Sequence, residues 1–235
     1  MIRLDKFLCD CNIGSRSQVK DYIRLGQVKI NNIIIKKTDT KLDENHDIVT
    51  FRGTPVSYRK YAYYMLNKPA GVVSATTDNT SDTVISLLKD VSDKDLFPVG
   101  RLDKDTTGLL FITNDGELAH NLLAPKKHVD KVYEVIIREP LSEHAVELLE
   151  SGVDIGDETT TLPSKVQIME EHLILLTIHE GRFHQVKRML KAIGNEVISL
   201  KRIAFGSLKL DPSLEPGAFR ELTEKEINHL LTENK

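Results

Sequence analysis

Cysteine is scarce in this sequence of 235 residues, and its scarcity argues against two classes of protein. The two cysteines are Cys9 and Cys11, which are separated by a single residue. Such neighbours provide no disulfide framework, and one C-x-C without a second pair is a poor zinc site. The eight histidines are scattered along the chain. We therefore predict no metal site, and a structural role near a helix core for at least one cysteine.

Long apolar runs are also missing. No run approaches the ~18 residues that a membrane helix requires. The N-terminus, Met1-Ile-Arg-Leu-Asp-Lys6, lacks the apolar core of a signal peptide. Internal repeats and low-complexity tracts are absent as well. These observations predict a cytoplasmic protein with no membrane partner, and we expect it to act as a monomer.

The net charge of −3 hides an asymmetry along the chain. Residues 1–60 hold 12 Lys and Arg against 7 Asp and Glu, whereas the remainder holds 20 against 28. A basic first quarter on an acidic remainder indicates a small module that faces a polyanion. Chance clustering of charge is the alternative.

The most distinctive stretch is Gly100-Arg-Leu-Asp-Lys-Asp-Thr-Thr-Gly108, followed by the apolar run Leu109–Thr113. Glycine permits backbone angles that other residues resist, so the two bracketing glycines predict a tight, shaped loop. The apolar run has the length of a buried strand that would anchor this loop. A solvated turn with surface charges is the simpler alternative. Four charged residues lie inside the loop: Arg101, Asp103, Lys104 and Asp105.

The segment from Phe97 to His120 resembles the catalytic motif of rRNA pseudouridine synthases, and is most similar to the ribosomal small-subunit pseudouridine synthase A type. The resemblance implies that Asp103 is the catalytic aspartate. Arg101 lies two residues away. We hypothesise that it fills the gap left by a flipped uridine or grips a phosphate.

Two further motifs of the family occur in the same order. Lys131-Val-Tyr-Glu-Val135 resembles the motif whose tyrosine stacks on the target uracil, which implies that role for Tyr133; a core position in a strand is the alternative. Glu180–Met189 is similar to the motif whose basic residue pairs with the catalytic aspartate, and by position this is Lys187. The same likeness implies that Arg182 and Arg188 bind RNA backbone, the alternative being a solvated helix face.

Tyr63–Ala75 resembles the first motif of the family, in which Lys68 and Pro69 help to shape the cleft. We also place Lys68 among the RNA contacts. A hairpin of purely structural importance explains these residues equally well.

The N-terminal segments Arg3–Leu8, Ser15–Ser17, Ile23–Val28 and Ile30–Asn32 resemble an S4 RNA-binding domain. This predicts an S4-like domain with its linker over residues 1–58 and a catalytic domain over residues 59–235. Each basic contact to phosphate would add salt-dependent affinity. The RNA contacts that the resemblance implies are Arg3, Lys6, Arg16, Lys20 and Arg24.

Converting uridine to pseudouridine breaks an N-glycosidic bond and rejoins the uracil through carbon, which requires no cofactor and no metal. It needs a carboxylate, a cation that holds the carboxylate, and a ring that retains the detached uracil. Asp103, Lys187 and Tyr133 are these three types. Whether Asp103 forms a sugar adduct, attacks the base or abstracts a ribose proton stays open, because all three routes need an ionised carboxylate. The uridine must leave its stack to reach Asp103.

The resemblance implies an α+β fold: a small S4 domain of two helices and short strands, then a synthase domain with a mostly antiparallel mixed sheet and flanking helices. The predicted function is site-specific isomerisation of uridine in 16S rRNA, at a site of the uridine-516 type. The predicted partner is ribosomal RNA or a small-subunit assembly intermediate. The alternatives are a relative that acts on 23S rRNA and, from another class, a non-catalytic ribosome-assembly factor that uses its S4 domain.

Overall fold

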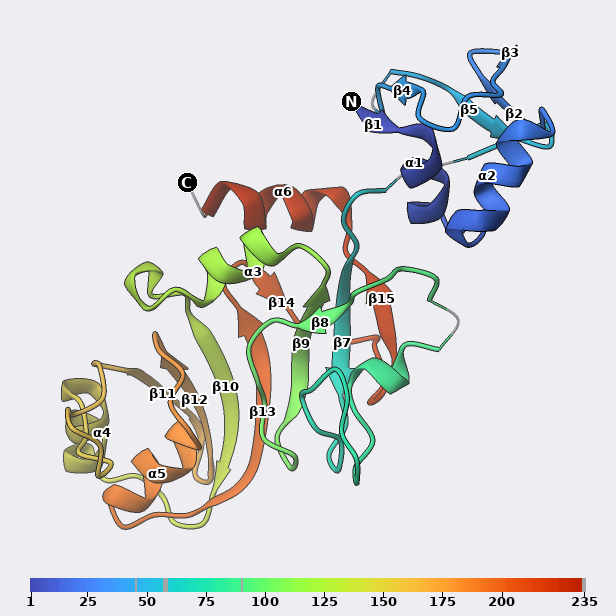
Figure 1. Ribbon diagram of the computed structural model, residues 1–235. Helices are drawn as coiled ribbons and strands as arrows, with labels where there is room; N and C mark the ends of the chain where they lie inside the picture. Colours follow the sequence, from blue (N-terminus) through green and yellow to red (C-terminus); the bar gives the residue numbers. More distant parts are fainter. Residues whose placement is uncertain (45, 57–58, 90, 234–235) are drawn as a thin grey trace. The chain divides into compact units, whose positions relative to one another are not determined.

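The computed structural model describes residues 1–44, 46–56, 59–89 and 91–233. The chain divides into two compact units (Figure 1). Unit 1 comprises Met1–Tyr61 with Ser92–Lys94, and unit 2 comprises Ala62–Val91 with Asp95–Lys235. The domain boundary was predicted to lie after residue 58, and residue 58 is outside the described residues.

Unit 1 contains two helices and short strands around a small apolar core. The order along the chain is β1 (Ile2–Arg3), α1 (Leu4–Asp10), α2 (Arg16–Arg24), β2 (Val28–Ile30), β3 (Ile33–Ile34), β4 (Lys41–Leu42), β5 (Val49–Phe51) and β6 (Thr54–Pro55). Strands β3, β2, β5 and β6 form one antiparallel sheet, and β1 pairs with β4.

Local sequence signals set the boundaries of these elements. Ser15 caps α2 through a capping box with Gln18, which satisfies backbone N–H groups that the first helical turn leaves without partners. The strand expected over Val28–Ile35 divides into β2 and β3, because Asn31 and Asn32 both adopt left-handed angles, with φ of 49° and 68°. Asparagine tolerates these angles better than most residues, so it turns the chain into a hairpin.

Unit 2 is built on a mixed sheet whose strands lie side by side in Figure 1 in the order β11-β12-β10-β13-β9-β7-β15. Strand β8 pairs with β9 and β14 with β13. Among the pairings between the described strands of this sheet, only that of β9 with β13 is parallel. A mixed, mostly antiparallel sheet with flanking helices confirms the predicted α+β fold class. The strands are β7 (Tyr63–Lys68), β8 (Phe97–Pro98), β9 (Thr107–Thr113), β10 (Lys131–Ile137), β11 (Lys165–Glu170), β12 (Leu173–Ile178), β13 (Val197–Phe205), β14 (Leu208–Lys209) and β15 (Phe219–Glu221).

Helices cover both faces of this sheet. Leu66 and Leu110 share a core with α4 (Glu143–Ser151) and α5 (Gln185–Ala192), whereas Met65 and Phe111, one residue along each strand, pack with α3 (Gly116–Leu123) and α6 (Glu224–Glu233). Successive side chains of a strand point to opposite faces, so β7 and β9 belong to both cores. No described helix has the length and apolar character needed to cross a membrane.

Candidate active site

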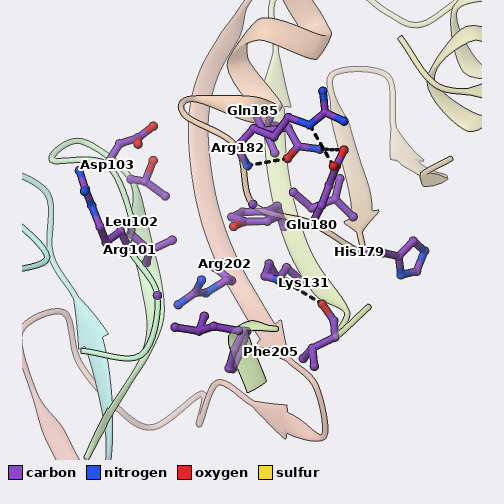
Figure 2. Close-up of a pocket in the computed structure, with 18 of the residues that line it drawn as sticks. Arg101, Leu102, Asp103, Lys131, His179, Glu180, Arg182, Gln185, Arg202 and Phe205 are labelled. Carbon is purple, nitrogen blue, oxygen red and sulfur yellow. Dashed lines mark hydrogen bonds and ion pairs between the residues drawn. The ribbon is translucent and has the colours of Figure 1, made fainter. Parts of the chain in front are cut away.

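A pocket of about 480 Å³ opens in unit 2, within the ~300–1,000 Å³ range of small-ligand sites. Its walls come from the loop Gly100–Gly108 before β9, from β10 and β13, and from the segment between β12 and α5. Figure 2 shows Arg101, Leu102 and Asp103 on one side, with Glu180 and Arg182 on the other. The pocket therefore brings together parts of three of the four synthase motifs, namely Phe97–His120, Lys131–Val135 and Glu180–Met189.

The loop that carries Asp103 is held in place by side chains from β7 and the residues after it. The Nζ of Lys68 donates to the carbonyl oxygens of Asp103, Lys104 and Thr106 at 3.0, 3.2 and 2.8 Å, and to that of Pro69 at 3.1 Å. The hydroxyl of Ser74 both donates to the carbonyl of Leu102 (2.8 Å) and accepts from its N–H (3.0 Å). These bonds fix the backbone on both sides of Asp103.

Lys68 is fully buried, with none of its surface exposed. The prediction that it contacts RNA is therefore wrong, because its ammonium group is occupied by backbone carbonyls. Burial lowers the pKa of Lys68 to about 8. Its geometry agrees with the other half of the prediction, a role in shaping the cleft.

The carboxylate of Asp103 meets two groups from the segment that opens α5. The Nζ of Lys187 lies 3.2 Å from Oδ2 of Asp103, and Nε2 of His184 lies 3.6 Å from Oδ1. Lys187 approaches Asp105 more closely, with Nζ 2.6 Å from Oδ1. The ammonium thus bridges two carboxylates, of which Asp105 was not predicted from the sequence.

These contacts set the electrostatics of the site. Burial alone would lower the pKa of Lys187, but its hydrogen bonds to Asp105 and Asp103, together with their charges, raise it overall. The hydrogen bond from Lys187 is also the largest cause that lowers the pKa of Asp105. A cation that stays protonated beside a carboxylate favours the ionised form of that carboxylate and restricts its orientation.

Tyr133 lines the pocket from β10 and is 7% exposed. Tyr133, Val135 and Ile137 are buried, as the alternation along this strand predicts. On the neighbouring strand β13, Arg202 is the registered partner of Tyr133, so a positive charge lies beside the tyrosine side chain.

Arg202 itself is a buried cation without a carboxylate partner among the described residues. Its Nε donates to the carbonyl of Leu109 at 2.8 Å, and its guanidinium lies 5.1 Å from the ring centre of Phe205. Its Nη2 has no hydrogen-bond partner in the part of the chain that the structure describes. Burial lowers the pKa of Arg202, and the nearby tyrosine opposes this effect.

Lys131 adds a second cation at the same wall (Figure 2). Its Nζ donates to the carbonyl of Val129 at 2.7 Å and lies 5.5 Å from the ring centre of Phe205, so both cations face one ring. Burial and then the charge of Arg202 lower the pKa of Lys131 to about 8. This wall can attract electron-rich oxygens of a bound ligand.

Arg182 and Arg188 are held by partners in the protein. Arg182 donates to Glu180 (2.9 Å) and to the carbonyls of Thr159 and Thr160 (2.6 and 2.8 Å), as Figure 2 shows in part. Arg188 donates to the carbonyl of Ile155 and forms an ion pair with Asp157. The two side chains therefore tie the segment 155–160 to α5, and their contact with RNA backbone stays a prediction.

The remaining predicted RNA contacts are exposed side chains. Arg101 lies at the pocket and is exposed to solvent. In unit 1, Arg3 is paired with Asp5 and Arg24 with Asp21, whereas the others form no salt bridge with any described residue. The exposed set of unit 1 is Arg3, Lys6, Arg16, Lys20 and Arg24.

Sequence reasoning missed Asp105, His184 and Arg202. Asp105 and His184 lay within motifs that were recognised, so their positions were noticed but their contacts were not, whereas Arg202 lay outside these motifs. The signal that singles out Arg202 is burial of a charged side chain, which appears only when β10 and β13 are paired. For Asp105, the signal is a second carboxylate within reach of the same ammonium.

The fold and this pocket together define a class of RNA-modifying protein, and comparison with known proteins specifies it. Residues 62–192 match the family model described as RNA pseudouridylate synthase, and residues 2–48 match the S4 domain. The first match covers more than half of the chain. The chain therefore belongs to the RNA pseudouridine synthase family, whose members are isomerases, and it carries an S4 domain at its N-terminus. The predicted family and enzyme class are confirmed.

Similar proteins span nearly the whole chain. An uncharacterised RNA pseudouridine synthase of Bacillus subtilis, YtzG, is 48% identical over 99% of both chains. Ribosomal small subunit pseudouridine synthase A of Vibrio cholerae is 40% identical, covering 96% of this chain and 98% of that protein. The corresponding protein of Escherichia coli K12 is 38% identical with the same coverage. A crystal structure of a pseudouridylate synthase aligns with a TM-score of 0.69 and 37% identity, over 98% of this chain and 100% of the other.

Proposed function

We propose that this protein isomerises one uridine of 16S ribosomal RNA to pseudouridine, at a site of the uridine-516 type, in the cytoplasm. The observation that carries the proposal is that Asp103 and Tyr133 line a single pocket, while the Nζ of Lys187 lies 3.2 Å from Oδ2 of Asp103. The small-subunit enzymes that are similar over nearly the full length favour 16S rRNA.

In this proposal each residue has one part in the reaction. Asp103 is the ionised carboxylate that acts on the nucleoside, and Lys187 keeps it charged and oriented. Tyr133 retains the uracil while its N1–C1′ bond breaks and its C5–C1′ bond forms, the C5 proton being lost and N1 gaining one. Arg202, the registered neighbour of Tyr133, places a positive charge beside the tyrosine, and no cofactor or metal takes part.

RNA contacts divide between the two units in the proposal. Arg101, exposed at the pocket, grips the phosphate of the flipped uridine or occupies the place it left. The exposed cations of unit 1 bind structured RNA, where each phosphate contact adds affinity that salt weakens. Small-subunit rRNA, free or in an assembly intermediate, is the proposed partner of a monomeric enzyme.

The test is to map pseudouridine in rRNA from cells with and without the gene, by carbodiimide modification and primer extension. We expect one stop in 16S rRNA to disappear with the gene, and to return with the wild-type chain but not with Asp103→Asn, because an amide is no nucleophile. Loss of a stop in 23S rRNA would instead support the alternative target. Restoration by Asp103→Asn would show that Asp103 is not the catalytic group, and an unchanged map would contradict the rRNA substrate.

A further inference from the structure

Phe183 is the exposed member of the seven phenylalanines, all of which lie among the described residues. It lines the pocket and is 70% exposed. A single exposed apolar side chain is ordinary on a protein surface. The stacking geometry of Phe183, however, distinguishes this ring from an incidental exposed side chain.

One face of Phe183 is covered by the next residue in the chain. The rings of Phe183 and His184 have centroids 3.8 Å apart and an interplanar angle of 17°, so they are stacked face to face. His184 adopts a left-handed backbone with φ of 48°, which a residue with a side chain rarely does. Conformations of this kind cluster at functional sites, where surrounding structure maintains them.

The stack begins at the catalytic carboxylate and ends in solvent. Nε2 of His184 lies 3.6 Å from Oδ1 of Asp103, and the His184 ring stacks on Phe183, which is 70% exposed. A planar apolar surface that lines the pocket is therefore open to solvent, two side chains from the group proposed to act on the nucleoside.

The backbone beneath the two rings is fixed by several hydrogen bonds. The Nη1 of Arg188 donates to the carbonyl of Phe183 at 3.1 Å, and the N–H of Arg188 donates to the carbonyl of His184 at 3.0 Å. Gln185 accepts from the N–H of Arg182 at 2.9 Å and donates to Glu180 at 3.0 Å. The ring is thus an exposed aromatic group on a rigid support, which is how preorganised binding surfaces are built.

We propose that the open face of Phe183 is a stacking platform for the base next to the target uridine. When a uridine is flipped into the pocket, its neighbour loses a stacking partner, and this loss is part of the cost of flipping. An aromatic side chain at the pocket mouth replaces that partner. Every base has a π face, so the platform accepts any neighbouring base and contributes affinity without reading sequence. The inference rests on the proposed function, because it assumes a nucleotide in the pocket.

The first measurement compares full-length variants in a tritium-release assay with [5-³H]uridine-labelled 16S rRNA transcript. We expect Phe183→Ala and Phe183→Leu to raise KM about tenfold, within the range reported for loss of one base–aromatic stack, with kcat little changed. Phe183→Trp should restore KM, because it restores a flat ring. Ile168→Ala, which removes an exposed apolar side chain of β11 away from the pocket, should match the wild type. A leucine variant with wild-type KM, or a tryptophan variant as impaired as alanine, would overturn the platform.

The second measurement separates this inference from the proposed function. Asp103→Asn and the double variant Asp103→Asn/Phe183→Ala are titrated with a nine-nucleotide RNA that has a single uridine flanked by 2-aminopurine. Stacking on Phe183 should quench the 2-aminopurine fluorescence in the single variant and not in the double variant. Equal quenching by both, or none by either, would contradict the platform. Absence of tritium release by the wild type would refute the proposed substrate, while the difference in quenching still decides whether Phe183 stacks on a base.

Discussion

Lys187 connects two carboxylates that differ in their access to solvent. The side chain of Asp105 is 74% exposed, whereas those of Asp103 and Lys187 are each 26% exposed. Exposed ion pairs contribute little, because water competes for both charges. We therefore expect the longer contact, to Asp103, to matter more for the reaction, and the shorter contact to Asp105 to position the ammonium group.

Replacing Lys187 should impair catalysis without preventing folding. We expect Lys187→Met to lower kcat by about 100-fold, the order seen when one preorganised charge is removed from an active site. The physical reason is that Asp103 loses the cation that pairs with its carboxylate and restricts its orientation. The measurement is the steady-state rate of tritium release, with thermal unfolding as the check on folding.

Two neighbours serve as controls for this prediction. Lys191→Ala removes an exposed lysine from the same helix, and should keep kcat near that of the wild type. Asp105→Asn leaves the ammonium with Asp103 alone and should change kcat by only a few-fold. If Lys187→Met and Lys191→Ala gave equal losses, the ion pair with Asp103 would have no role in the reaction.

Lys68 shows how one buried side chain can hold a catalytic loop. Its ammonium is shared among four carbonyl oxygens, three of them in the loop Gly100–Gly108. A buried acceptor left without a donor costs about 1–3 kcal/mol. We expect Lys68→Met, which keeps the length of the side chain, to lower the free energy of unfolding by about 3 kcal/mol in urea titrations.

The matched substitution for this measurement is Lys89→Met, because Lys89 is an exposed lysine of the same unit. Its effect should stay within about 0.5 kcal/mol, as for ordinary surface changes. A comparable loss for the two variants would mean that the carbonyl contacts of Lys68 do not stabilise the loop.

At the scale of elements, the parallel pairing of β9 with β13 places the catalytic loop beside Arg202. Gly108 is registered with Arg202 at this junction and has φ of 97°. A Cβ built on Gly108 would lie 2.3 Å from the carbonyl oxygen of Arg202, closer than real Cβ atoms approach backbone. Glycine is therefore required here for close approach as well as for backbone angle.

Gly108→Ala should separate the two strands and destabilise the chain by more than about 2 kcal/mol, since both strain and a backbone clash are introduced. Gly156→Ala is the control, because Gly156 also has positive φ (80°) but no atom within 4 Å of its added Cβ. The difference between the two variants in urea unfolding isolates the clash from the strain. If the two variants lost the same free energy of unfolding, the close approach of β9 and β13 would not contribute to the loss caused by Gly108→Ala.

Most elements and part of the candidate site can be predicted from local sequence. The remainder depends on long-range packing. Ser15 and the alternation around Tyr133 were predictable because a cap or a strand face depends on residues a few positions apart. Lys68 was misread as an RNA contact because its partner Thr106 lies 38 residues away. Arg202 was missed because its hydrogen bond to Leu109 spans 93 residues. The sequence of a motif does not show whether the charge of a lysine or arginine faces solvent or a group of backbone carbonyls. Only the folded backbone distinguishes the two.

At the scale of the whole molecule, the charge asymmetry predicts a separate part for each unit in binding RNA. Unit 1 exposes cations that form no salt bridge with described residues, of which Lys6, Arg16 and Lys20 lie on or next to α1 and α2. Binding that neutralises phosphates releases counterions, so its affinity falls as salt rises. Under the proposed function, chemistry at Asp103 in unit 2 would have no such direct dependence once RNA is bound.

We therefore expect the triple variant Lys6→Ala/Arg16→Ala/Lys20→Ala to weaken binding to 16S rRNA transcript and leave kcat at saturating RNA unchanged. The slope of log affinity against log salt should become shallower by about 2–3, because each lost phosphate contact contributes ~0.7–0.9. The matched control replaces three other exposed lysines of unit 1, Lys36, Lys37 and Lys41, with alanine. If the slope changed equally in both triple variants, net charge alone would account for binding; if it changed in neither, RNA would be held by unit 2, and the S4 resemblance would not describe how this chain engages its substrate.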